Sequence, residues 1–91
     1  MSDALAALRE RFVARCVGDL ARLRDLSRGD LTSSDLQDLA HSLAGAAGTF
    51  GFPRVSEVAG RVDDRFAVGQ APTPSDIDAL IAALQEVVET A

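Results

Sequence analysis

The chain has 91 residues, an apolar fraction of 47% and a formal net charge of −5 at pH 7. A chain this short supports one core, which predicts a single domain over residues 1–91. The acidic balance excludes a general binder of nucleic acid or of an anionic membrane, since phosphate groups require a basic surface, and it favours a protein partner.

Two helices are predicted in the first half of the chain, because apolar side chains recur there every three or four positions. The first covers about residues 3–26, and its stripe is Leu5, Leu8, Phe12, Cys16, Leu20 and Leu23. The second covers about residues 34–50, opens on a capping box of Ser34 and Gln37, and ends near Gly51. Its inward face is Leu36, Leu39, Ala40, Leu43, Ala47 and Phe50.

A proline marks the start of each later helix. Pro53 fits the first position of a helix over about residues 53–68. Pro74 follows the cap Thr73 and fits the first position of a helix over about residues 74–89. Their apolar stripes are Val55, Val58, Ala59, Val62 and Phe66, then Ile77, Leu80, Ile81, Leu84, Val87 and Val88. The pattern predicts an all-α antiparallel four-helix bundle. No large apolar stripe is left over in the sequence, so we expect a monomer.

The single cysteine and the single histidine limit the side-chain chemistry. One cysteine cannot form an internal disulfide. One cysteine and one histidine together cannot supply the three or four ligands of a typical zinc site, so we expect no metal. Cys16 lies in an apolar stripe, which favours a small buried core residue over a reactive thiol. No secretory leader and no membrane span are apparent, which predicts a cytoplasmic protein without a membrane partner.

The histidine is predicted to point out of the bundle. A helix advances about 100° per residue, so the apolar face of residues 34–50 lies within about 60° of Leu36, whereas His41 lies about 140° away. The residues beside it on this outer face are Gln37, Asp38, Ala44, Gly45 and Gly48. A glycine inside a helix costs about 1 kcal/mol relative to alanine, so glycines beside an exposed ring indicate room for another molecule.

The residues alone therefore indicate an accessible imidazole that accepts a group or binds a partner. Two other interpretations stay open at this point: a plain solvated histidine, and glycines that serve close packing against a neighbouring helix. Asp38, one turn from the ring, is a candidate for a hydrogen bond to His41 and not for a catalytic base.

The stretch "HSLAGAAGTFG", from His41 to Gly51, resembles the signature of histidine-containing phosphotransfer (HPt) domains of bacterial phosphorelays. The matching residues are His41, Leu43, Gly45, Ala46, Ala47 and Gly51. The next helix is also similar to that of the family, with Asp63 where an acidic residue is usual. The resemblance covers essentially the whole chain and implies a four-helix bundle.

The resemblance also implies the function. His41 would carry a phosphoryl group on its distal nitrogen, Nε2, and exchange it with the aspartate of a response-regulator receiver domain or a hybrid histidine kinase. The receiver would bring Mg²⁺, so this chain would need no cofactor and would have no independent catalysis. The outer face around the histidine, Gln37, Asp38, Ala44, Gly45 and Gly48, would dock the partner.

One position departs from the family signature. Ala44 stands where many members carry a lysine, and the chain contains no lysine at all. Arg61 and Arg65 are the candidates for a cation beside His41, with a solvated basic flank as the alternative. Ala44 also keeps a second function open, that of a helical adaptor that binds a receiver or kinase without being phosphorylated.

Overall fold

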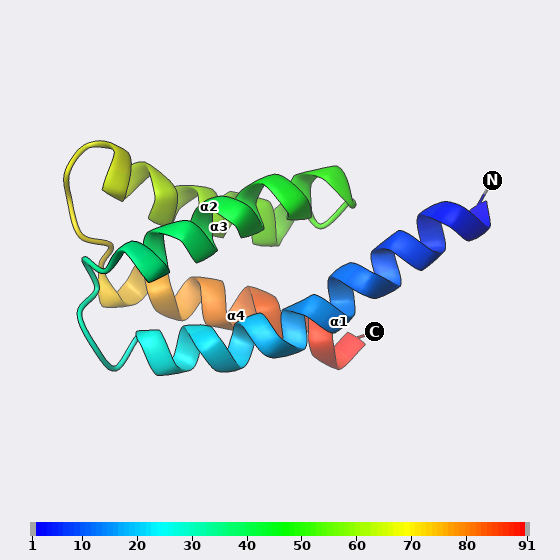
Figure 1. Cartoon of the computed structure of the whole chain (residues 1–91), viewed down its shortest axis with the longest axis horizontal. Coiled ribbons are helices and arrows are strands. Elements are labelled where there is room, and N and C mark those ends of the chain that lie inside the picture. The colour runs from blue at the N-terminus through cyan, green and yellow to red at the C-terminus, as the bar shows by residue number, and fades with distance from the viewer. Residues whose placement is uncertain (1, 91) are drawn as a thin grey trace.

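The computed structural model describes residues 2–90 and contains four α-helices in that range. They are α1 (Ser2–Leu26), α2 (Ser34–Thr49), α3 (Pro53–Ala67) and α4 (Pro74–Thr90). Successive helices run antiparallel, and each packs against its neighbours in the chain, while α1 also packs against α4 (Figure 1). The order around the bundle is therefore the order along the chain. The predicted all-α four-helix bundle is confirmed; residues 1 and 91 of the predicted domain lie outside the described residues.

The core is built from aliphatic side chains of all four helices, together with Phe12 and Cys16 of α1. No polar or charged side chain is buried in the described part of the chain. Cys16 is fully buried, and this burial, with a smaller contribution from the charge of Asp19, raises the pKa of its thiol to about 11. A thiol in this state is a structural core residue, as the sequence predicts.

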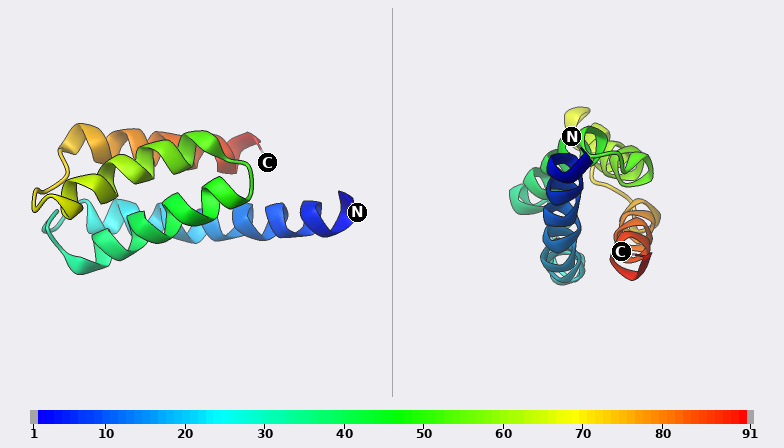
Figure 2. Two further views of the ribbon diagram at one scale, coloured as in Figure 1. Left: turned by 90° about the horizontal axis from the view of Figure 1, so that it is seen from above. Right: turned by 90° about the vertical axis from the view of Figure 1, so that its right-hand side faces the viewer.

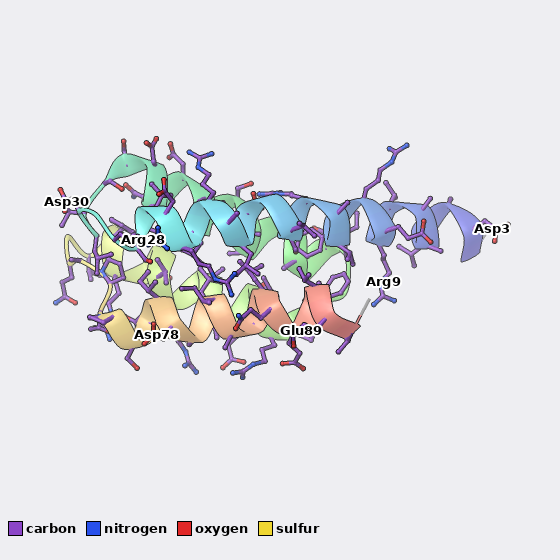
Figure 3. The ribbon with its side chains drawn as sticks, turned by 90° about the horizontal axis from the view of Figure 1, so that it is seen from below. Asp3, Arg9, Arg28, Asp30, Asp78 and Glu89 are labelled. Atoms are coloured by element: carbon purple, nitrogen blue, oxygen red, sulfur yellow. The ribbon has the colours of Figure 1, made fainter. Side chains whose placement is uncertain are left out.

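α1 extends past the end of the bundle at its N-terminal end (Figure 2). Its 25 residues span about 37 Å, against about 24 Å for the 16 residues of α2. Figure 3 shows Arg9 near the level at which α4 ends and Asp3 well beyond it. Leu5 and Leu8 are therefore 53% and 41% exposed: the predicted apolar stripe continues to this end of α1, but within residues 2–90 no other helix reaches far enough to cover it.

Polar caps and glycines set the helix ends within one residue of the predicted bounds. The N-cap of α2 is Ser33, whose Oγ accepts a hydrogen bond from the Leu36 N–H over 3.3 Å, so the predicted box beginning at Ser34 is one residue late. The α2 helix ends at Thr49 with Phe50 as its C-cap, and the chain turns at Gly51, which has a φ of 83° that only glycine adopts easily. Pro53 then begins α3 directly, as predicted.

Thr73 caps α4 through a reciprocal pair of hydrogen bonds. Its Oγ1 accepts from the Asp76 N–H over 3.1 Å, and the Asp76 carboxylate accepts from the Thr73 N–H over 3.0 Å. Two of the free N–H groups at this helix start are thereby satisfied. The predicted cap at Thr73 is confirmed, and it fixes the sharp turn between α3 and α4.

Candidate functional site

His41 lies midway along α2 with its ring facing solvent. Its side chain is 77% exposed, whereas Ala40 and Leu43 on either side of it point into the core. The predicted outward orientation is confirmed. The ring is held at one point, because its Nδ1 lies 2.9 Å from Oδ2 of Asp63 on the neighbouring helix α3.

Asp63 distinguishes the two ring nitrogens. Its ionised carboxylate can only accept a hydrogen bond, so Nδ1 carries the proton that it donates, and in the neutral ring the lone pair lies on Nε2. This hydrogen bond, and next the negative charge of Asp63, raise the pKa of His41 above its ordinary value; the charge of Asp38 adds a smaller contribution. Asp38 thus acts on the ring through its charge alone, and its predicted hydrogen bond is replaced by that of Asp63.

The outer face of α2 combines small and polar residues around the ring. Asp38 and Gly45 are exposed, and Gln37 and Ala44 are half-buried. A Cβ added at Gly45 would meet no atom within 4 Å, so the surface beside the ring is open there. This is the space that the sequence predicts for an approaching molecule.

Gly48, two turns after the histidine, lies against α3. A Cβ at this position would come within 3.2 Å of the Ser56 hydroxyl oxygen. The same hydroxyl donates a hydrogen bond to the Ala44 carbonyl over 2.8 Å, which joins α3 to the backbone of α2. Close packing of α2 against α3 therefore explains the glycine at position 48 without a partner. This is the alternative that the sequence left open.

Arg61 and Arg65 lie on the side of α3 away from the histidine. Each is two residues from Asp63, hence about 200° around the helix from the carboxylate that meets the ring. Arg61 pairs with a glutamate one turn earlier on α3, and the Arg65 Nε lies 3.2 Å from Oδ2 of Asp76 on α4. The expectation that either one supplies a cation at His41 is therefore wrong, and the solvated basic flank is what the structure has.

Arg15 of α1 is hydrogen-bonded to the residue that follows His41. The Arg15 Nη2 donates to Oγ of Ser42, the residue after His41, over 2.6 Å, while its Nε donates to Asp19 over 2.8 Å. Sequence reasoning missed both Arg15 and the ring contact of Asp63. The acidic residue at position 63 was a usable signal, but no signal in the sequence shows which flank of α1 meets α2.

The described residues contain neither a metal-ligand cluster nor a membrane-spanning helix. Within residues 2–90, no group of three histidine, cysteine or acidic side chains could hold a metal ion. No helix in the same range is long and apolar enough to cross a membrane.

An antiparallel four-helix bundle with one exposed, carboxylate-supported histidine on its second helix defines a class of helical carrier and docking domains. The family model for the Hpt domain matches residues 7–90, and the chain belongs to this family. Neither a curated protein nor a solved structure matches it significantly. As an Hpt domain, the chain has a phosphotransfer role in a phosphorelay, in which it partners with receiver domains or kinases.

Proposed function

We propose that His41 is the phosphorylated residue and that it exchanges the phosphoryl group with the aspartate of a response-regulator receiver domain. The observation that carries this proposal is the one-sided support of the ring: Asp63 occupies Nδ1, and Nε2 faces solvent. Neutral imidazole is a good nucleophile near pH 7, and the exposed nitrogen is the one that a partner can reach.

In the forward step, the lone pair of Nε2 attacks the phosphorus of the receiver's aspartyl phosphate. The N–P bond forms, the P–O bond to the receiver's aspartate breaks, and that aspartate leaves as a carboxylate. The ring keeps its proton on Nδ1 and so acquires a positive charge. The Asp63 carboxylate, 2.9 Å from Nδ1, stabilises this charge, and the reverse step returns the phosphoryl group along the same path.

The face around His41 forms the docking surface in this proposal, with Gln37, Asp38, Ala44, Gly45 and Gly48 as its members. Phosphoryl transfer needs close approach and in-line alignment above all, and the open space beside Gly45 permits both. The receiver supplies the Mg²⁺ and the acidic pocket around its aspartate. The chain is then a carrier, active only together with its partner, and we expect it to work as a monomer.

The test is phosphoryl transfer from receiver domains that have been labelled with radioactive acetyl phosphate. We expect an acid-labile, alkali-stable label on the native chain and none on His41→Gln. Arg24→Gln, a change of an exposed side chain on α1, serves as the control and keeps the label. Binding of a receiver without label on the native chain would instead favour the adaptor function that Ala44 keeps open.

A further inference from the structure

Among the described residues, Arg15 is the one arginine whose guanidinium is hydrogen-bonded to a residue adjacent to His41 in the chain. Its Nη2 donates to Ser42 Oγ over 2.6 Å. Ser42 directly follows His41 on α2, so this contact holds the guanidinium on the flank of α2 that meets α1, one residue along from the histidine. Asp63 contacts the ring from α3, and Arg15 from α1 bonds the next residue along α2. An anion and a cation are thus held on the two flanks of this turn of α2.

Two contacts orient the guanidinium and leave most of its donors unused. The Arg15 Nε–H is taken by Asp19 over 2.8 Å, and one Nη2–H by Ser42. A guanidinium has five N–H groups, so three remain for a ligand. The side chain is 36% exposed, which gives these donors access to the surface. An oriented cation is therefore bonded to the residue next to His41, although Ala44 supplies none.

We propose that Arg15 binds the phosphoryl group carried by His41 and supplies the positive charge that Ala44 lacks. This inference rests on the proposed function, since it assigns the phosphoryl contact of the same site. When the N–P bond forms, Arg15 exchanges the Ser42 hydroxyl for a phosphoryl oxygen and no covalent bond to Arg15 changes. The exchange is favourable, because a guanidinium binds a charged oxygen more strongly than a neutral hydroxyl.

Asp19 is a positioning residue in this arrangement. Its carboxylate holds Nε, so the fork of the guanidinium is oriented before the phosphoryl group arrives. During transfer, negative charge is spread over the three phosphoryl oxygens, and donors that are already oriented stabilise it most effectively. Arg15 therefore stabilises both the phosphorylated histidine and the transfer step.

The direct test needs no partner protein. Phosphoramidate phosphorylates exposed histidines chemically, and ³¹P NMR then follows the pKa of the phosphoryl group on His41. We expect Arg15→Gln to raise this pKa by about 0.5 unit, since a nearby cation stabilises the dianion. Arg15→Lys should restore part of the shift. The matched control is Arg24→Gln, which removes the same charge about 180° around α1 and should leave the pKa unchanged.

A second measurement is the rate of transfer to a receiver domain, which should fall about tenfold in Arg15→Gln and not in Arg24→Gln. Equal phosphoryl pKa values in the two glutamine variants would overturn the proposal, even if transfer slowed in one of them. Failure of the proposed function gives a different result: the chemically labelled native chain would transfer nothing to a receiver, while the ³¹P titrations would still report on Arg15. Circular dichroism checks that each variant remains folded.

Discussion

Asp63 on α3 accepts a hydrogen bond from Nδ1 of His41 on α2, across the interface between the two helices. This single contact fixes the tautomer of the ring and leaves its other nitrogen open to solvent, and in the proposed transfer it places a negative charge where the ring becomes positive. The two residues are 22 positions apart in sequence, and the short turn at Gly51 brings them together.

Replacing Asp63 should change the titration and the reactivity of the histidine together. In Asp63→Ala the ring loses both the hydrogen bond and the charge that raise its pKa, so the pKa of His41 falls toward its ordinary value. Asp63→Asn retains an acceptor oxygen for Nδ1–H and should lower the pKa less. NMR titration of the ring measures both. Phosphoryl transfer should fall at least about tenfold in the alanine variant, and an unchanged pKa there would contradict the role given to Asp63.

The rate of phosphoryl transfer to His41 should rise with pH. Only the neutral ring has a lone pair on Nε2, and the raised pKa of His41 means that the ring stays protonated to a higher pH than an isolated histidine. The rate should therefore increase through the pKa of the folded protein and then level off. In Asp63→Asn the same increase should come at lower pH. Rates from one labelled receiver over pH 5.5 to about 9 test this.

The same interaction makes the folded protein more stable at low pH, whereas the transfer rate rises with pH. A raised pKa in the folded state means that the protonated ring stabilises the fold, fully so below the ordinary pKa of 6.5, and that this stabilisation is lost as pH rises through the folded value. The effect is small because the ring is exposed and its charge is screened. Urea unfolding of native protein and His41→Gln at two pH values isolates it, and the difference should shrink at high salt.

Gly45 and Gly48 should respond differently to alanine. At Gly45 the added Cβ meets nothing within 4 Å, so Gly45→Ala should stabilise α2 by about 0.5–1 kcal/mol through helix propensity. At Gly48 the Cβ would press on the Ser56 hydroxyl at 3.2 Å and disturb its bond to the Ala44 carbonyl. Gly48→Ala should therefore gain less or lose stability. Urea unfolding compares the two, and equal gains would contradict the packing role of Gly48.

A bulky side chain at Gly45 should block the partner without harming the fold. Gly45→Gln fills the open surface beside the ring, so transfer from a receiver domain should fall about tenfold or more, given the close approach that transfer requires. Labelling by phosphoramidate, a small reagent, should stay the same and is the control. Loss of both reactions would show that the variant damages His41 itself and would contradict the docking role.

The two ends of the α1 stripe should differ in their effect on stability. Leu23 is fully buried, so Leu23→Ala should cost about 2–5 kcal/mol. Leu5 and Leu8 lie on the part of α1 that extends past the bundle, and Leu5→Ala or Leu8→Ala should cost about 0.5 kcal/mol or less. Thermal unfolding separates the two groups. A large loss at Leu5 would show that a partner or a second copy covers this end.

The spacing of apolar residues predicted which face of each helix points into the core. It identified the buried face of α2, and hence the outward direction of His41, because both depend only on the 100° step between residues of one helix. The spacing does not predict the offset of one helix along another. This offset decides how far α1 extends past its neighbours, and the stripe from Leu5 to Leu23 contains no information about it. The exposure of Leu5 and Leu8 therefore appears only in the structure.

The same reason explains the wrong cation. Arg61 and Arg65 form a basic flank that is evident from sequence, but which neighbour that flank faces depends on the rotation of α3 against α2. Asp63 occupies the side that meets the histidine, and the arginines two residues away consequently face elsewhere. Arg15 is 26 residues before His41 on a helix whose rotation is equally invisible in the sequence, so its bond to Ser42 was not predicted.

The one-sided support of the ring also restricts how the carrier can work with two partners. If His41 carries the phosphoryl group as proposed, donor and acceptor must both reach Nε2 from the same side of α2. The proposal then predicts that the two partners compete for that side and that the first leaves before the second arrives. Successive exchange of this kind gives ping-pong kinetics, in which each partner at high concentration competes with the other for the same face.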